Sequence, residues 1–453
     1  MDRHAADWSA LPAHVLHAFA AWLEPEERVR AALACTRWRD ALFEPSVWKH
    51  FSLSADPEAH NLAQATAALR GASRLAAGGM ARLRLNKVFY ALPEADLVAV
   101  LRENSGALEE LHLPDVVNEV SLDFPYEIVD LVTTLRAAAP RLRAITLEEL
   151  RLPAHEAAQL LRDRDKPPLD VVHAEELILD CDPDEYKLEV FEDDDEEAQQ
   201  HETELTDALA ALTELPVKDE QLTFRRRSEE RAPAYASNAA FTDAMRAAAA
   251  RYSEVRFQYA NERGISGFLV TAASLTRLLT TSAVLTRLSV CNVNGLGLDA
   301  DTASAFAAAL RNSATLADVE LVGLRMWTPA HIGTSIVAAL TNHPRLQCIS
   351  LDDAVSDDAG ARAMGAAYGA LVAANAPALR ELRASFVVEA RLDFSVVDGV
   401  LAPLADALPH NTHLRSLNLG GPICGGDTGM RLATAIRTLR MRSQLRSIML
   451  GFA

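Results

Sequence analysis

The stretch from Gly421 to Thr428 has the residue types and spacing of a phosphate-binding loop, which would hold a nucleotide. It follows an expected strand, precedes an expected helix and has glycines at Gly421 and Gly426. Such loops use a lysine to bind the phosphates, but this chain has Asp427 at that place. A carboxylate there would repel phosphate groups. The stretch therefore predicts a glycine-rich turn and no nucleotide site.

Histidines and cysteines could bind a metal or act as nucleophiles, but their spacing argues against both. The pairs His14–His17 and His410–His413 lack further ligands at a spacing that suits zinc. The five cysteines are far apart and form no Cys-x-x-Cys pair: Cys35, Cys181, Cys291, Cys348 and Cys424. The chain also has no Gly-x-Ser-x-Gly motif. We expect no catalytic residue, no metal and no cofactor, and a reducing compartment.

Residues 11–50 have the apolar spacing of three short helices. The first begins at Leu11-Pro12, and its apolar residues are Val15, Leu16, Phe19, Trp22 and Leu23. The second begins at Pro25, and Glu26, Glu27, Arg28 and Arg30 give it a charged side. The third follows Cys35, and after it come Val47, Trp48 and Phe51. Because about forty residues without a disulfide or metal seldom fold alone, this region is expected to dock on a partner.

The Leu11-Pro12 start, the run from Cys35 to Arg39 with Trp38, and the late Trp48 occur in an order that resembles the F-box family. The resemblance implies binding to the Skp-type adaptor of cullin-based ubiquitin ligases, and through it to a cullin. It implies these adaptor-binding residues: Leu11, Pro12, Val15, Leu16, Phe19, Leu23, Val29, Leu33, Trp38 and Trp48. One difference is His14, where the family usually has an acidic residue. The alternative is a helical cap for the domain that follows.

Beyond residue 80 the chain repeats the motif Leu-x-x-Leu-x-Leu. Clear copies begin at Leu108, Leu142, Leu285, Leu316, Leu346, Leu414 and Leu445. Weaker copies cover 174–179, 252–257 and 379–384, and a possible first strand covers 82–85. From Leu285 onward, with the copy at 379 included, the starts are 31, 30, 33, 35 and 31 residues apart. This regularity predicts one strand in each repeat.

Alanine-rich helical patterns lie between these strands, at 300–311, 329–341, 359–375 and 429–440. Alternating strands and helices predict an α/β solenoid, or horseshoe, with a parallel concave sheet. The pattern resembles leucine-rich repeats of the long, ribonuclease inhibitor-like kind. The expected organisation is a small all-α F-box-like domain at 8–53, a helical linker at 54–79 and a leucine-rich repeat domain at 80–453.

An acidic run from Asp182 to Glu204 interrupts the repeat with twelve acidic residues and one lysine. Its composition predicts a disordered, solvated insertion at about 182–204. The alternative is an acidic bait for basic partners. The following Arg225-Arg226-Arg227 is too short to indicate a nuclear signal.

Alternation within the strands predicts which side chains face outward from the sheet. The candidate target-binding residues are Glu110, His112, Glu176, Glu254, Arg256, Arg287, Asp318, Glu320, Glu381 and Arg383, and Asp180, Asp352 and Asn418 share this face. Acid outnumbers base there, which suits a basic protein target. The alternative is that these charges only keep the sheet soluble.

The net charge of −19 argues against a surface for nucleic acid or anionic membranes. The N-terminus lacks a signal-peptide layout, and no run approaches the ~18 apolar residues of a membrane span. We therefore expect a cytoplasmic or nuclear protein. The predicted function is the non-catalytic substrate-recognition subunit of an SCF-type ubiquitin ligase. The alternative is a leucine-rich repeat scaffold or inhibitor that is not linked to ubiquitination.

Overall fold

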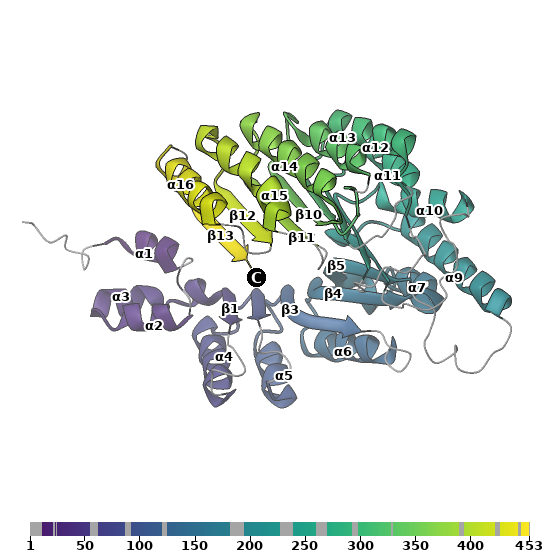
Figure 1. Cartoon of the computed structure of the whole chain (residues 1–453). Coiled ribbons are helices and arrows are strands. Elements are labelled where there is room, and N and C mark those ends of the chain that lie inside the picture. The colour runs from purple at the N-terminus through teal and green to yellow at the C-terminus, as the bar shows by residue number, and fades with distance from the viewer. Residues whose placement is uncertain are drawn as a thin grey trace, which may run out of the picture. The chain divides into compact units, whose positions relative to one another are not determined.

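The structure, a computed structural model, describes residues 11–20, 23, 25–54, 62–86, 92–119, 125–181, 194–226, 239–259, 270–291, 298–327, 329–388, 394–421, 426–442 and 445–452. The chain divides into two compact units (Figure 1). The first comprises Met1–Leu152 with Gln159–Leu177, and the second comprises Pro153–Ala158 with Ile178–Ala453.

The N-terminal region is helical, as expected. It consists of α1 (Ala13–Ala20), α2 (Pro25–Ala32), α3 (Thr36–Leu42) and the 3-10 helix η2 (Pro45–Trp48). Pro25 suits the first position of α2 because that position needs no N–H donor. Leu16 and Ala20, one turn apart on α1, are both buried.

Strands and helices alternate through the rest of the described chain. The strands are β1 (His50–Ser54), β2 (Arg82–Asn86), β3 (Glu110–Glu119), β4 (Ala144–Pro153), β5 (Val172–Asp180), β6 (Gln221–Arg226), β7 (Glu254–Tyr259), β8 (Arg287–Cys291), β9 (Asp318–Val322), β10 (Cys348–Val355), β11 (Glu381–Val388), β12 (Ser416–Gly421) and β13 (Ser447–Phe452). The helices between them are α4 (Leu62–Ala76), α5 (Glu94–Glu103), α6 (Pro125–Ala138), α7 (Ala154–Asp163), α9 (Asp194–Glu214), α10 (Ala239–Ala249), α11 (Ala272–Thr281), α12 (Ala300–Asn312), α13 (Ala330–Leu340), α14 (Asp358–Ala373), α15 (Phe394–Ala407) and α16 (Gly426–Arg442), with short 3-10 turns at η4 (Leu169–Val171) and η6 (Leu408–His410).

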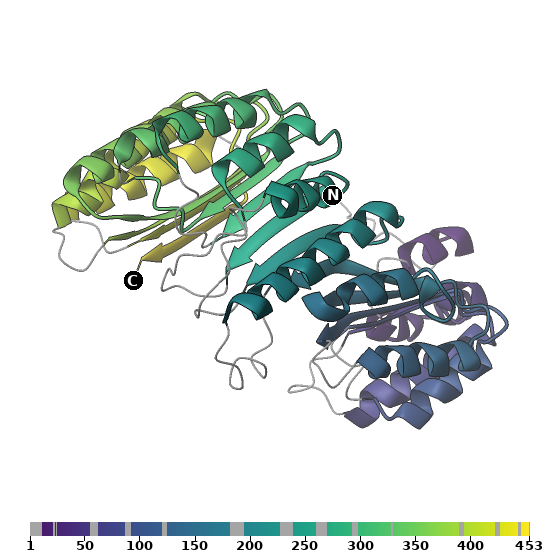
Figure 2. The same ribbon diagram turned by 90° about the vertical axis from the view of Figure 1, so that its right-hand side faces the viewer.

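The strands follow one another in the sheet in chain order, from β1 to β13. The strand pairs whose register is described are parallel, with a shift of register between β3 and β4 after Leu113. On β9 and β10, for example, Leu321 lies beside Leu351. Figure 2 shows the helices of the second unit packed on one face of its strands. This arrangement confirms the predicted α/β repeat: every expected copy coincides with a strand, and in the copies before β13 the apolar strand positions that face the helices are buried.

Two strands were not predicted from the sequence. One is β6, and the other is β1, which follows η2 directly and pairs with β2 from His50↔Arg82 to Ser54↔Asn86. The sheet therefore starts at His50 and not near residue 80. The expected linker at 54–79 contains α4, and with β1 this helix makes the first strand–helix unit, in which Leu69 is fully buried.

The acidic insertion also differs from its prediction, because residues 194–204 are helical. They form the first half of α9, while 182–193 lie outside the described residues. Glutamate, glutamine and alanine favour helix, and Gln200 donates a hydrogen bond to Glu204 one turn on, at 2.8 Å. The second half of α9 is anchored by its buried apolar residues Leu205, Ala208, Leu209 and Leu212.

Buried polar side chains hold the turns that lead from a helix into the next strand. Asn411 accepts N–H bonds from His413 and Leu414, both at 3.0 Å, and donates to the Val372 carbonyl at 3.0 Å. The His343 ring accepts from the Leu346 N–H at 3.1 Å and also contacts the Ser313 carbonyl at 3.1 Å. These bonds satisfy backbone groups that would otherwise be buried without partners.

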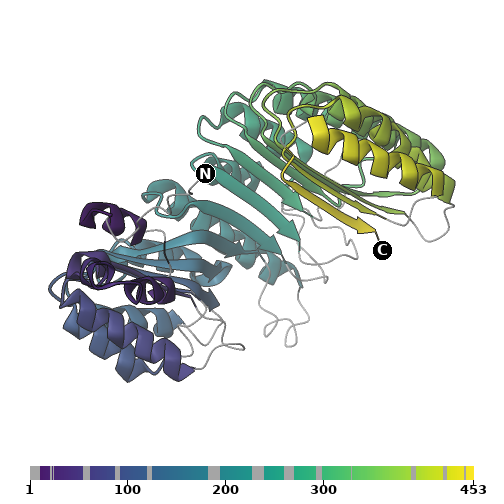
Figure 3. The same ribbon diagram turned by 90° about the vertical axis from the view of Figure 1, so that its left-hand side faces the viewer.

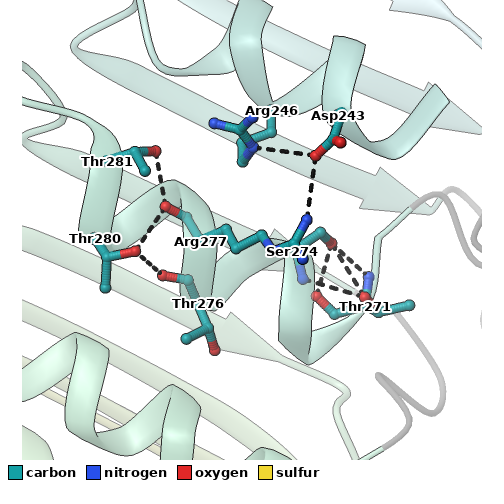
Figure 4. A network of polar contacts seen from close by, with 8 residues as sticks. All are labelled: Asp243, Arg246, Thr271, Ser274, Thr276, Arg277, Thr280 and Thr281. Atoms are coloured by element: carbon teal, nitrogen blue, oxygen red, sulfur yellow. Dashed lines mark hydrogen bonds and ion pairs between the residues drawn. The ribbon is translucent and has the colours of Figure 1, made fainter. Parts of the chain in front are cut away.

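The starts of α11, α12 and α14 in the second unit are capped by side chains. At α11, Thr271 and Ser274 form a capping box, in which each side chain accepts from the backbone N–H of the other (Figure 4). Figure 4 also shows Asp243 on α10 between two arginines, 3.2 Å from Arg277 and 3.5 Å from Arg246. These contacts fix α11 beside α10.

Candidate partner-binding surfaces

The N-terminal helices share a small core of their own. Its centre is Ala20, Ala32 and Leu42, one residue from each of α1, α2 and α3. Ala31, Trp38, Phe43 and Val47 pack against this centre and are partly buried. The helices are thus tied to one another by apolar contacts, and few of their large side chains are needed for this.

Trp48, at the end of η2, contacts these helices. Its Nε1–H donates to the Leu42 carbonyl at 2.9 Å, and its ring lies 6.0 Å from that of Phe51 on β1. The Arg28 guanidinium lies over the Trp48 ring at 5.6 Å and donates to the Leu23 carbonyl at 2.9 Å. Arg28 is therefore buried, although the sequence placed it on the charged side of α2. A run of charged residues in the sequence does not indicate that one of them packs against a tryptophan ring.

On the face of the sheet opposite the helices, which we call the open sheet face, charged side chains pair across strands. Glu254, Arg287 and Asp318 are in register on β7, β8 and β9. Arg287 lies 3.1 Å from Glu254 and 3.4 Å from Asp318. Three of the predicted target-binding residues are therefore adjacent, and they partly neutralise one another.

The next positions on the open sheet face continue this pairing. The Ser289 hydroxyl donates to Glu320 at 2.6 Å, and Arg383 lies 2.7 Å from Glu381 on the same strand. Arg256, in register with Ser289, is half-buried. Seven of the ten predicted residues thus share the open sheet face of the second unit.

Carboxylates on the open sheet face are partly removed from water. Burial raises the pKa of Asp318, although the neighbouring Arg287 acts in the opposite direction. Burial likewise raises the pKa of Asp352 on β10. These groups would gain from a cation that approaches the sheet.

The other three predicted target-binding residues belong to the first unit. Glu110 on β3 makes an ion pair with Arg82 on β2, and this hydrogen bond lowers the pKa of Glu110. His112 lies 3.7 Å from the same carboxylate. Glu176 on β5 is half-buried.

The thiols of the open sheet face are unsuited to nucleophilic chemistry. Burial raises the pKa of Cys291 and raises that of Cys348 to about 11. Both thiols are therefore protonated at neutral pH, and the thiolate is the reactive form.

In the stretch that resembles a phosphate-binding loop, β12 ends at Gly421 and α16 starts at Gly426. Residues 422–425, with Cys424, lie outside the described residues.

Two further properties concern the described part of the chain as a whole. Within it, no three histidine, cysteine, aspartate or glutamate side chains are grouped so that they could hold a metal ion. None of its helices is both long and apolar enough to cross a bilayer.

Comparison with known families matches residues 8–54 to the family described as F-box-like. Residues 8–54 form an F-box-like region. No curated protein matches the chain in sequence. Among solved structures, Leiomodin-1 Actin-Binding Site 2 (ABS2) aligns with 18% identity and a TM-score of 0.28, over 37% of this chain and 87% of that one.

Within the F-box-like region, the residues expected to bind the adaptor fall into three groups. Leu16 and Trp48 are buried in the protein's own core. Leu11, Val15, Leu23 and Trp38 are half-buried, and Pro12 is exposed. Phe19, Val29 and Leu33 are exposed, with exposed fractions of 50%, 42% and 79%.

Two of the ten residues expected to bind the adaptor are therefore not at the surface. Leu16 and Trp48 hold the region together and do not present their side chains to a partner in this structure. Val29 and Leu33 are one turn apart, so they lie on the same side of α2 and its C-terminal end. Of the ten expected residues, the large apolar side chains that are exposed are therefore Phe19 on α1, Val29 on α2 and Leu33 at its end.

Proposed function

We propose that this protein is the non-catalytic substrate-recognition subunit of an SCF-type cullin ubiquitin ligase. Its F-box-like region binds the Skp-type adaptor, and its strand–helix repeats, which resemble leucine-rich repeats in sequence, bind a protein target. Its contribution to the reaction is proximity, because a tethered target has a raised effective concentration near the charged ubiquitin-conjugating enzyme. No residue of this chain needs to react.

The observation that carries the proposal is the F-box-like match at residues 8–54 together with the apolar side chains left exposed there. Monomeric proteins seldom leave large apolar groups such as Phe19 and Leu33 in water without a docking role when several occur in one small region. The F-box-like region supports adaptor binding in general. The link to a cullin and the nature of the target extend this by resemblance.

The repeats support a binding role for the open sheet face. On the open sheet face of the second unit, the five carboxylates named above outnumber the three arginines: Glu254, Asp318, Glu320, Asp352 and Glu381 against Arg256, Arg287 and Arg383. Because burial already raises the pKa of Asp318 and Asp352, a lysine or arginine from a target would restore favourable interactions. We therefore propose a basic segment as the target's contact.

The test is a calorimetric titration of the full-length chain with a purified Skp-type adaptor. The variant is Phe19→Asp with Leu33→Asp, because both side chains are exposed and their replacement leaves the core intact. The matched control is Val217→Asp with Val284→Asp, two exposed apolar residues of the second unit, at 41% and 46%. We expect the Phe19–Leu33 variant to lose at least about thirtyfold in affinity, since one apolar anchor contributes about 2 kcal/mol.

The control variant should bind as the wild type does. If the folded wild type does not bind the adaptor, the proposal is wrong, and the repeats then serve a scaffold or inhibitor unconnected with ubiquitin. Equal losses in both variants would mean that the binding has no site at the F-box-like region.

A further inference from the structure

Across β1, β2 and β3, the open sheet face of the first unit has a charge balance opposite to that of the second unit. Two rows of side chains in register point to this face: His50, Arg82 and Glu110, then Ser52, Arg84 and His112. Leu83 and Leu85, which alternate with the two arginines on β2, are fully buried, so the arginines point away from the core. Figures 1 and 3 show α4 and α5 on the other side of these strands.

Arg84 lies in the middle of this group and has no acidic neighbour in register. Its neighbours are Ser52 on β1 and His112 on β3. Its guanidinium donates to the Asn86 side-chain oxygen at 2.9 Å, and no carboxylate of the described chain lies within ion-pair distance of it. Because Arg84 is exposed, its remaining N–H donors are available to a ligand.

Arg82, on the same strand, is paired with a single carboxylate. Its partner is Glu110, whose carboxylate also lies 3.7 Å from His112. In the second unit, by contrast, Arg287 has a carboxylate on each side. The two arginines of β2 therefore share one carboxylate, and this face can accept further negative charge.

The two arginines are spaced like alternate side chains of an extended peptide. Residues i and i+2 of a β-strand point to the same face and are about 6.6 Å apart. An extended segment that lies along β2 therefore brings acidic residues at alternate positions opposite Arg82 and Arg84. A carboxylate can accept two parallel hydrogen bonds from one guanidinium, so each such contact is both charged and directional.

We propose that the open sheet face of β1, β2 and β3 is a docking site for an acidic, extended segment of a partner protein. Its carboxylates pair with Arg84 and, in exchange with Glu110, with Arg82. Ser52 and His112, beside Arg84, supply further donors. A nucleic acid is a poorer occupant, because two arginines neutralise few phosphates and the net charge of −19 repels the rest.

This site is distinct from the adaptor-binding side chains and from the acidic face of the second unit, so it does not depend on the proposed ligase role. The probe is a fluorescein-labelled dodecapeptide of alternating glutamate and serine, added to the full-length chain at low salt and followed by fluorescence anisotropy. The matching glutamine–serine peptide reports the requirement for charge, and a single-stranded DNA 20-mer reports nucleic-acid binding.

The first pair of variants reverses one positive charge on either side of the sheet. Arg84→Glu replaces an attraction by a repulsion and should weaken binding of the glutamate–serine peptide about tenfold. The matched control is Arg74→Glu, at an exposed arginine of α4 on the helical side, which should leave the affinity within about twofold. Both variants have the same net charge, so the difference between them reports the site and not long-range repulsion.

The second pair tests the competition with Glu110 through a gain in affinity, which a loss of folding cannot produce. Glu110→Gln releases Arg82 and should strengthen binding of the glutamate–serine peptide about fivefold. The matched control is Asp96→Asn, which releases Arg70 on the helical side at the same net charge and should leave the affinity within about twofold. Circular dichroism confirms that each variant is folded.

Several results would overturn the proposal. They are no binding by the folded wild type, equal binding of the glutamine–serine peptide, equal effects of the two arginine variants, and no greater gain in Glu110→Gln than in Asp96→Asn. DNA that binds more tightly than the peptide and is weakened by Arg84→Glu would assign the arginines to a nucleic acid instead.

Discussion

Leu419 and Leu450 occupy equivalent, adjacent positions on β12 and β13, but only Leu419 is buried, at 1% against 47% exposed. Truncating either to alanine removes about three carbon groups, worth roughly 0.8 kcal/mol each when fully buried. Leu419→Ala should also leave a cavity, so we expect it to lower the free energy of unfolding by roughly 2–5 kcal/mol. Leu450→Ala should cost about 1 kcal/mol, because half of its side chain already contacts water and solvent fills the space.

The assay is urea denaturation followed by circular dichroism, with hydrogen–deuterium exchange of peptides from 414–452 to identify the transition that includes β12 and β13. This identification matters because repeat proteins can unfold in parts. Equal losses for the two variants would refute the reasoning, since they would mean that Leu450 is covered in solution. A loss below about 1 kcal/mol for Leu419→Ala would contradict the tight packing of the repeat core.

Three other predictions concern buried polar groups. Burial lowers the pKa of His343, so as the pH falls below about 6.5 the unfolded chain takes up a proton that the folded chain does not. The free energy of unfolding should therefore fall from pH 7 to pH 5. In His343→Asn it should fall less, as urea midpoints would report. The Asp353 carboxylate accepts N–H bonds from Arg325 and Met326, both at 2.7 Å, so Asp353→Ala should cost on the order of 3 kcal/mol in the same assay. Because burial raises the pKa of Asp353 to about 6, its ionisation should lower stability as the pH rises through 6, an effect absent in Asp353→Ala. Trp48→Phe leaves the Leu42 carbonyl without its donor and should lower the thermal midpoint, with a cost of about 1–3 kcal/mol, whereas Trp38→Phe, at a half-buried position, should cost less.

Repeated local patterns were the part of the fold that could be predicted. The Leu-x-x-Leu-x-Leu copies located the strands because side-chain alternation and burial follow directly from the spacing of apolar residues. The strand β6 was missed because Leu222 and Phe224 do not follow a leucine at the usual place. The helical half of the acidic run was missed because composition reports charge and not the buried anchors of α9, such as Leu209.

The candidate surfaces were predicted less well than the strands that carry them. The sequence indicated which face of each strand points outward, and Glu254, Arg287 and Asp318 do meet there. It could not indicate that these three residues pair with one another. In the F-box-like region, spacing alone could not separate Leu16, which is buried, from Phe19, which is exposed.

By itself the sequence determined the periodicity, the parallel strand–helix repeat and the F-box-like pattern at the N-terminus, because these depend on residue spacing along one segment. Only the tertiary structure decided which apolar side chains are covered. Ile448 and Leu450 have the same local pattern as Leu417 and Leu419 but different exposure. Likewise, Arg28 is buried because its guanidinium lies over the Trp48 ring and donates a hydrogen bond to the Leu23 carbonyl. Burial depends on neighbours that are distant in the chain, and a local pattern contains no information about them.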